Sequence, residues 1–254
     1  MAKAIPQSAD PTVRYLSTSQ AYDLWSAVYD TDGNFLQALD TIEMKIFMPR
    51  LLGLLEASAL SRPWKLVDLG CGTGRNTAAL LEVKDANVFG LDVSPGMLEV
   101  ARRRLENGGA KGRLSLEVFD MIEQDSASDS ALNADAVVST LVLEHVPVDV
   151  FFNHVAKILR PGGYLLLTNM HSEMGGISQA GFVDPDTGEK IRPTSYAHTI
   201  AEVEAEAAKK GFELIGNQIE QRAVDESLVS LLGARSAKWV GVTVWFGGIF
   251  QKKN

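Results

Sequence analysis

Short apolar runs alternate with amphipathic stretches through the middle of the chain. The runs 136–138 and 165–167 are continuously apolar, which is typical of strands that are buried on both faces of a sheet. Between such runs, apolar residues recur three and four positions apart, which predicts helices. The pattern predicts strands over 65–69, 87–92, 113–119, 134–140 and 163–169, and helices over 75–82, 95–107 and 148–159. This alternation predicts an α/β fold with helices on both faces of a parallel sheet.

The two ends of the chain have a different pattern. At the N-terminus, we expect a mobile tail over 1–19, a short helix over 20–30 and a longer helix over 35–59. At the C-terminus, a helix over 199–210 precedes a strand over 212–219, a short helix over 225–232 and an apolar run over 239–246. A turn region rather than a crossover helix precedes the last run, which favours an antiparallel strand. We therefore expect residues 20–254 to form a single domain.

Two polar segments interrupt the alternation. The Asp- and Ser-rich stretch 124–130 is predicted to be a surface loop. The longer segment 170–198 follows the fifth predicted strand, and its sequence Asp-Pro-Asp-Thr-Gly at 184–188 is typical of a turn between two short strands. Because open sheets bind ligands at the carboxyl ends of their strands, we expect this insertion to form a lid over a site.

A glycine-rich turn follows the first predicted strand of the alternating region. The sequence Asp68-Leu-Gly-Cys-Gly-Thr-Gly74 leads from an apolar strand into a helix, so its backbone N–H groups would face a bound ligand. In the dinucleotide fingerprint G-x-G-x-x-G, the last glycine would fall at position 75, which is Arg75. The third glycine comes one position earlier in this chain, which argues against a nicotinamide dinucleotide.

This turn resembles motif I of the class I S-adenosylmethionine-dependent methyltransferases. The sequences Leu-Glu-His-Val-Pro at 143–147 and Leu-Arg-Pro-Gly-Gly at 159–163, with Tyr-Asp-x-Trp-x-x-x-Tyr-Asp at 22–30, resemble the small-molecule and quinone branch of that family. The resemblance implies a Rossmann-like fold with a mostly parallel seven-stranded sheet and an antiparallel last strand. It also implies S-adenosyl-L-methionine as the cofactor, a helical cap over 20–60 and a lid insertion over 170–198.

Acidic residues end the second and third predicted strands. Asp92 lies 18 positions beyond Gly74 (92 minus 74), where a carboxylate can accept both ribose hydroxyls of a nucleotide, and Ser94-Pro95 then begins a helix. At the end of the third strand, the resemblance implies that Asp120 accepts from the adenine amino group. The predicted cofactor residues are Trp25, Tyr29, Asp68, Gly70, Cys71, Gly72, Gly74, Asn76, Asp92, Val93, Met97, Asp120, Met121, Thr140 and Leu141.

Four histidines are candidates for a base, because histidine has a suitable pKa. His154 lies within a predicted helix, so we assign it a structural or exposed position. The predicted catalytic residues are His171, His198 and His145, and the first two are preferred because the lid segment brackets them. The predicted acceptor-binding residues are Tyr22, His145, Met170, His171, Tyr196 and His198. The spacing of histidines and the lone Cys71 matches no zinc motif, so no metal is expected.

Composition narrows the choice of partners. The 254 residues are 46% hydrophobic, which is enough to bury a core, and the net charge of -8 with a pI near 5.1 argues against a nucleic-acid partner. With one cysteine no intrachain disulfide is possible, so we expect a cytoplasmic location. No apolar run approaches about 18 residues, so we expect no membrane partner. The expected partner is a small-molecule methyl acceptor, bound to a monomer or homodimer.

Three functions are compatible with these observations. The leading hypothesis is methyl transfer from S-adenosylmethionine to a small organic acceptor, most often at nitrogen or oxygen, by an in-line displacement that depends mainly on positioning. The second is an NAD(P)-dependent oxidoreductase, against which Arg75 and the late strand argue. The third is a non-catalytic protein of the same fold that binds the cofactor without transferring a methyl group.

Overall fold

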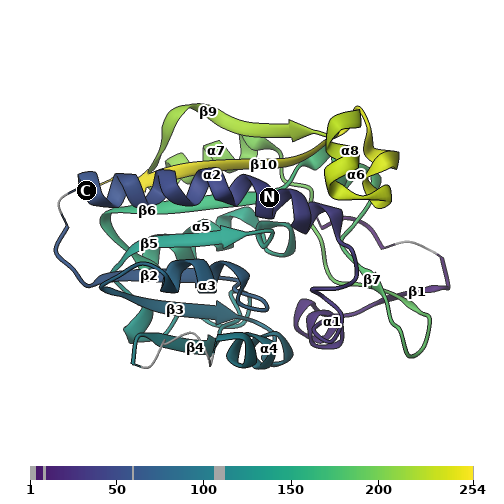
Figure 1. Cartoon of the computed structure of the whole chain (residues 1–254), viewed down its shortest axis with the longest axis horizontal. Coiled ribbons are helices and arrows are strands. Elements are labelled where there is room, and N and C mark those ends of the chain that lie inside the picture. The colour runs from purple at the N-terminus through teal and green to yellow at the C-terminus, as the bar shows by residue number, and fades with distance from the viewer. Residues whose placement is uncertain (1–3, 8–9, 59, 106–111, 254) are drawn as a thin grey trace.

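The computed structural model describes residues 4–7, 10–58, 60–105 and 112–253. A seven-stranded sheet in the order β4-β3-β2-β5-β6-β10-β9 runs through the molecule (Figure 1). β2 to β6 pair in parallel, and β10 pairs antiparallel with both β6 and β9. The strands are β2 (Trp64–Leu69), β3 (Ala86–Asp92), β4 (Leu114–Val118), β5 (Ala134–Thr140), β6 (Leu159–Met170), β9 (Phe212–Ala223) and β10 (Thr243–Lys252). The predicted Rossmann-like fold with an antiparallel last strand is confirmed.

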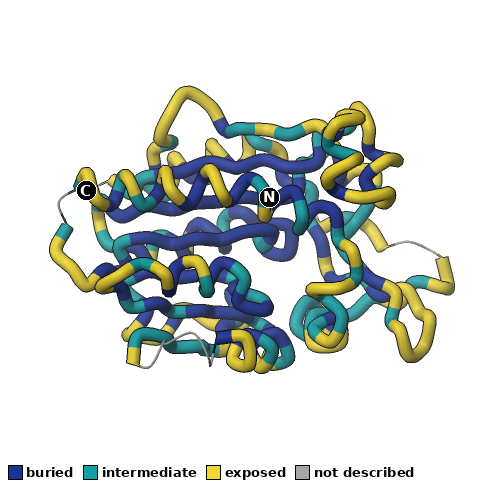
Figure 2. The backbone as a smooth tube through the Cα atoms, viewed as in Figure 1, coloured by how far each residue is buried: buried dark blue, intermediate teal, exposed yellow. Residues whose placement is uncertain are grey.

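Helices cover both faces of this sheet. α2 and α3 pack on one face with Leu39, Leu51 and Leu80, and α5 and α7 pack on the other with Phe151, Phe152 and Val203. Figure 2 shows that the buried backbone continues along β5, β6 and β10 between these layers. The helices are α1 (Thr18–Trp25), α2 (Phe35–Ala57), α3 (Arg75–Leu81), α4 (Pro95–Leu105), α5 (Val148–Ile158), α6 (Ser172–Ile177), α7 (Ile200–Lys209) and α8 (Glu226–Leu232), with 3-10 turns η1 (Asp129–Ala131), η2 (Leu143–His145) and η3 (Ala234–Trp239).

The helical cap expected over 20–60 is divided between two places. α1 lies beyond the carboxyl ends of the strands, whereas α2 lies across the sheet face (Figure 1). Leu39 and Leu51 of α2 are fully buried, and the ring of Phe47 meets that of Trp245 edge-on at 5.7 Å. The 23-residue helix α2 is therefore part of the core, and only α1 is placed to cover a ligand.

The N-terminal segment and the insertion after β6 together form a second, smaller sheet. β1 (Val13–Tyr15) pairs in parallel with β8 (Lys190–Arg192), and β8 pairs antiparallel with β7 (Phe182–Val183). The predicted hairpin around 184–188 is thus confirmed. The expected tail boundary at residue 20 differs from the structure, because β1 and the first turn of α1 come before it. Since β8 supplies β1 with backbone hydrogen-bond partners from 177 residues away (190 minus 13), local sequence does not reveal this pairing.

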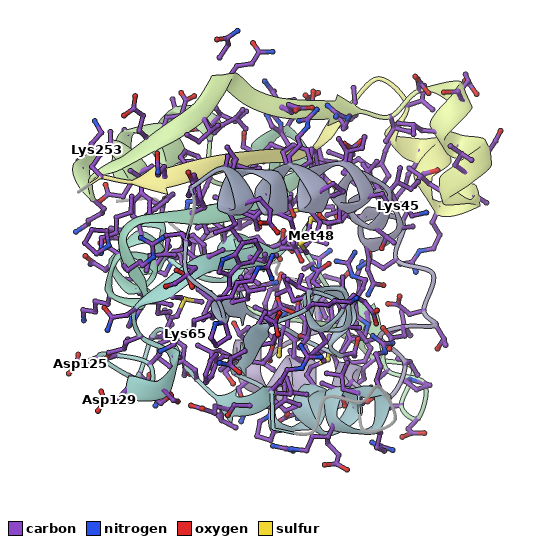
Figure 3. The ribbon with its side chains drawn as sticks, turned by 60° about the vertical axis from the view of Figure 1, so that its left-hand side comes forward. Lys45, Met48, Lys65, Asp125, Asp129 and Lys253 are labelled. Carbon is purple, nitrogen blue, oxygen red and sulfur yellow. The ribbon has the colours of Figure 1, made fainter. Side chains whose placement is uncertain are left out.

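Several element boundaries differ from the predictions. The last strand begins at Thr243 rather than 239, because Gly241 adopts a positive φ of 85° before it and Trp239 packs on Phe35 within η3. α4 ends at Leu105, and the remainder of the helix predicted over 95–107 lies outside the described residues. The loop predicted over 124–130 is at the surface, and Asp125 and Asp129 extend outward from it (Figure 3).

In the described part of the chain, no helix is both long and apolar enough to cross a membrane.

A buried acidic residue connects α2 to the sheet. Asp40 is completely buried and accepts hydrogen bonds from the Thr168 hydroxyl at 2.6 Å and the Trp245 indole N–H at 3.0 Å. The Arg75 guanidinium pairs with its other carboxylate oxygen at 2.6 Å. These contacts join α2, α3, β6 and β10 around one charge. Because a buried charge is costly unless it is paired and hydrogen-bonded, each partner matters for stability.

We predict that Asp40→Asn lowers the free energy of unfolding by about 3–5 kcal/mol, because it leaves the Arg75 cation without its buried counter-ion. Urea denaturation of the purified variant measures this loss. The control is Glu99→Gln, which removes an exposed carboxylate 3.5 Å from Arg102 and should cost at most about 1 kcal/mol. Equal effects of the two substitutions would contradict the importance assigned to the Asp40 network.

Candidate active site

The turn after β2 contains three residues with positive φ, a backbone conformation that glycine adopts without strain. Gly70, Gly72 and Gly74 have φ values of 75°, 52° and 83°. A Cβ atom on Gly70 would lie 2.1 Å from a methyl group of Val142, so a side chain there would displace the neighbouring loop. The Gly70 N–H donates to the Leu91 carbonyl at 2.7 Å, and this hydrogen bond connects the turn to β3. The predicted glycine turn is therefore present at the carboxyl edge of the sheet.

Asp92, at the end of β3, is held against this turn. One carboxylate oxygen accepts from the Gly72 N–H at 2.8 Å, and the other accepts from the Ser94 N–H at 2.9 Å. Ser94 in turn caps α4, because its hydroxyl accepts from the Met97 N–H at 3.0 Å. Burial raises the pKa of Asp92 to about 6. The carboxylate thus has a fixed orientation and a poorly solvated environment, in which further hydrogen-bond donors would be favourable.

A cavity of about 380 Å³ opens at this edge, between the turns of the sheet and α1. Nine of the predicted cofactor residues line it. They are Tyr29, Gly70, Gly72, Asp92, Val93, Asp120, Met121, Thr140 and Leu141. Residues from the ends of β2, β3, β4 and β5 therefore meet in one cavity, as the order of the parallel strands requires.

Six further residues predicted to bind the cofactor do not line the cavity. They are Trp25, Asp68, Cys71, Gly74, Asn76 and Met97. Asp68 lies beneath the turn, where it accepts from the Thr77 hydroxyl at 2.6 Å and where burial raises its pKa to about 6. Asn76 donates to the Thr140 hydroxyl at 2.8 Å, and Trp25 and Met97 belong to a small apolar cluster under α1. These residues support the lining rather than form it.

At the other end of the cavity, Tyr22 and His145 form a hydrogen-bonded pair. The Tyr22 hydroxyl lies 2.8 Å from Nε2 of His145, and Nδ1 of the same ring lies 2.9 Å from the Thr194 carbonyl. A carbonyl oxygen only accepts, so Nδ1 carries a proton and donates it. In the neutral ring Nε2 then has a lone pair, and the Tyr22 hydroxyl donates to it. Both side chains line the cavity.

Two more tyrosines line the same end of the cavity, Tyr29 from the segment after α1 and Tyr196 from the insertion. The ring of Tyr22 lies 6.0 Å from that of Tyr29, and Tyr196 stacks on His198 at 5.4 Å with an interplanar angle of 8°. This end of the cavity is therefore predominantly aromatic. Such a lining suits an acceptor with an apolar or aromatic body.

The structure places the two preferred histidine candidates outside the cavity. His198 is buried, and its Nε2–H donates to the Val146 carbonyl at 2.9 Å. Its ring stacks on Tyr196, so it packs against a lining residue rather than lining the cavity itself. His171 caps α6 by accepting from the Glu173 N–H at 3.1 Å, and Met170 is buried in the main core. Burial lowers the pKa of both histidines. Of the three histidines predicted to be catalytic, only His145 reaches the cavity, and His154 is structural as assigned, donating to the Met121 carbonyl.

The lining also contains residues that the sequence did not predict. Ser17, Thr18 and Ser19, which were assigned to the mobile tail, border the cavity, as does Ile122 beyond β4. A signal for the first group is present, because Ser17 and Gln20 form a reciprocal capping box at the start of α1. The remaining unpredicted lining residues are Leu69, Phe119, Glu123, Val142, Val146 and Thr194. Among the described residues, no group of three His, Cys, Asp or Glu side chains is arranged to hold a metal ion.

We predict that the Asp68 carboxylate makes stability depend on pH. Its folded-state pKa of about 6 lies above the ordinary value of 3.8, so the folded protein takes up a proton in a pH window where the unfolded chain does not. The contribution of Asp68 to the free energy of unfolding therefore increases as pH falls through that window. Urea denaturation near pH 7 and near pH 4.5 should show that the difference between wild type and Asp68→Asn changes by about 1–3 kcal/mol in favour of the wild type at the lower pH. If the difference in free energy of unfolding between wild type and Asp68→Asn were the same at both pH values, burial would not raise the pKa of Asp68.

Known proteins with similar sequences and structures agree with this geometry. Residues 67–167 match the family described as "Methyltransferase domain". An uncharacterized methyltransferase of Emericella nidulans is 49% identical to the chain over 259 residues, which cover 92% of this chain and 91% of that protein. The ubiquinone biosynthesis O-methyltransferase of Vibrio atlanticus is 28% identical over 152 residues, which cover 59% of each protein.

Solved structures show the same fold. An S-adenosylmethionine-dependent methyltransferase from Mesorhizobium loti superposes with a TM-score of 0.56 at 21% identity, over 78% of this chain and 95% of that chain. In this chain the glycine turn after β2 is hydrogen-bonded to Asp92 at the end of β3, and β10 pairs antiparallel with β6 in the same sheet. The chain therefore belongs to the class I S-adenosylmethionine-dependent methyltransferases, and S-adenosyl-L-methionine is its cofactor.

Proposed function

We propose that this methyltransferase acts on an oxygen or nitrogen atom of a small organic acceptor bound beside Tyr22 and His145. One observation supports this proposal above the others. The residues suited to the nucleoside, Asp92 and Asp120, and the aromatic residues at the opposite end, including Tyr196, line a single cavity. S-adenosylmethionine supplies a methyl group on a sulfonium sulfur. The protein then has to hold the acceptor in line with that methyl group and exclude water.

The end of the cavity proposed to bind the nucleoside has one carboxylate for the ribose and another for the adenine. Asp92 has two oriented carboxylate oxygens for ribose hydroxyls. Asp120 is held by the Ile122 N–H, which donates to it at 2.8 Å, and lies among the apolar side chains of Phe119 and Met121. An adenine ring fits such a pocket, because its faces are apolar and its amino group is a donor.

The acceptor end favours a group that loses a proton as it is methylated. His145 in its neutral form has an Nε2 lone pair within hydrogen-bond distance of Tyr22, so it can act as a base. A hydroxyl acceptor needs such a base, and the Vibrio relative is named as an O-methyltransferase. Methylation at oxygen is therefore the first choice and methylation at nitrogen the second.

Two other hypotheses were an NAD(P)-dependent oxidoreductase and a non-catalytic protein that binds the cofactor. Membership of the methyltransferase family argues against the oxidoreductase, as the glycine spacing does. A protein that binds S-adenosylmethionine without transferring the methyl group would retain the same turn and the same Asp92. Incorporation of labelled methyl groups into small molecules distinguishes that possibility from catalysis.

We predict that Asp92→Ala weakens the binding of S-adenosylhomocysteine by about 1–3 kcal/mol, because it removes charge-assisted hydrogen bonds to the ribose. Isothermal titration calorimetry near neutral pH measures the change. The fold of the variant is checked separately by circular dichroism, since Asp92 also holds the turn through Gly72. Unchanged affinity in a folded variant would show that the ribose does not lie at the end of β3.

We predict that His145→Asn lowers methyl transfer by about 10²–10⁴-fold, which is the usual contribution of a positioned base. The assay follows labelled methyl groups from S-adenosylmethionine into a metabolite extract of Emericella nidulans, the organism of the 49% identical relative. His171→Asn should retain most of the wild-type incorporation, because His171 lies outside the cavity. If His171→Asn lost more methyl incorporation than His145→Asn, the base would be His171 of the insertion rather than His145. No incorporation by the wild type, with S-adenosylhomocysteine bound, would favour the non-catalytic hypothesis.

A further inference from the structure

A buried acidic side chain lies beside the histidine that lines the cavity. Glu144 precedes His145 in η2, and its side chain is 5% exposed. Its Oε1 lies 3.5 Å from Nε2 of His145. Its Oε2 is fully buried and has no hydrogen-bond partner among the residues that the structure describes. Glu144 therefore faces the nitrogen that carries the lone pair.

The backbone around Glu144 is fixed from two sides. Its N–H donates to the Asn169 side-chain oxygen at 3.2 Å, and its carbonyl accepts from the Tyr196 N–H at 2.7 Å. The backbone that carries this side chain is thus fixed by β6 and by the insertion. Burying a carboxylate without full hydrogen bonding costs free energy, so packing alone does not explain its position. A cation formed on His145 would lie beside Oε1 and would give the buried carboxylate a charge partner.

The Tyr22 hydroxyl is the group between His145 and the space for the acceptor. It donates to Nε2 of His145 at 2.8 Å, which leaves its own oxygen lone pairs for a donor in the cavity. Burial raises the pKa of Tyr22 well above its ordinary value, and nearby negative charges add to this effect. Tyr22 therefore stays protonated at rest and is suited to passing a proton on rather than to acting as the base itself.

We propose that Tyr22 is a catalytic residue that relays a proton from a neutral hydroxyl of the acceptor to His145, and that Glu144 is a positioning residue that stabilises the imidazolium. The proposal rests on the proposed function and names its acceptor class, a hydroxylated compound with an apolar or aromatic body. The Tyr22 hydroxyl is the hydrogen-bond partner of Nε2, so a proton that passes through it reaches the lone pair of His145.

The relay conserves protons and charge. The acceptor O–H bond breaks and its proton goes to the Tyr22 oxygen, while the Tyr22 O–H bond breaks and that proton goes to Nε2. The acceptor becomes an oxyanion, and His145 becomes a cation that donates at Nδ1 to the Thr194 carbonyl and lies beside the Glu144 carboxylate at Nε2. The oxyanion retains the electron pair that would form the new bond to the methyl carbon, as the methyl–sulfur bond breaks and its electron pair stays on the sulfur.

The ionisation of a coloured phenol tests the relay without turnover. We would add 4-nitrophenol to the complex with S-adenosylhomocysteine, at a pH where the free phenol is mostly protonated, and record the absorbance of the phenolate. The wild type should bind the phenol and ionise it. Tyr22→Phe and Glu144→Gln should each reduce the ratio of ionised to neutral bound phenol by about tenfold, the change that one pKa unit produces. The control Glu204→Gln changes an exposed residue of α7 and should match the wild type.

Thermal denaturation of the same variants separates a positioning role from a structural one. If Glu144 serves the reaction, Glu144→Gln should melt at the wild-type temperature or above it, because a costly buried carboxylate has been removed. A lower melting temperature with a normal ionised fraction would overturn the proposal and make Glu144 structural. Failure of the wild type to bind or to ionise 4-nitrophenol would overturn it as well. Failure to bind S-adenosylhomocysteine, measured first by calorimetry, would instead contradict the proposed function.

Discussion

The two hydrogen bonds that the Asp92 carboxylate accepts fix the geometry of the cofactor end of the site. One oxygen holds the Gly72 N–H and the other holds the Ser94 N–H, so a single side chain joins the turn after β2 to the turn after β3. The glycine turn can approach a ligand only because it is held in this position. Burial raises the pKa of Asp92, and further hydrogen-bond donors on a ligand would reduce the free-energy cost of that burial.

The opposite end of the site depends on segments that are far apart in the sequence. Trp25 of α1 stacks on Phe182 of the insertion at 5.1 Å, and Asp23 accepts from the Ser94 hydroxyl at 2.6 Å. The N-terminal segment and the insertion thus form one cap, which is attached to the turn after β3. The Tyr22 and His145 pair lies under this cap and faces the cavity. The two ends of the cavity are therefore connected through the same few contacts.

The sequence predicted the glycine turn and Asp92 at the carboxyl edge of the sheet, but it did not predict the direction of the histidine side chains. Gly72 lies in the turn after β2 and Asp92 ends the neighbouring strand β3, so the parallel order of the sheet brings the two residues together. The preference for His171 over His145 was wrong in placement, because the direction of a side chain in an irregular insertion depends on tertiary packing. The structure differs from the expected tail boundary for a similar reason, since β1 pairs with β8, which is far away in the sequence.

A crystal structure of the complex with S-adenosylhomocysteine tests the central claim most directly. The geometry predicts the ribose hydroxyls at Asp92, the adenine beside Asp120 and the sulfur directed toward Tyr22 and His145, with an acceptor-sized space between them. A sulfur atom directed away from Tyr22 and His145 would contradict the claim. Occupation of the separate cavity bordered by Arg75 and α2 would contradict it as well.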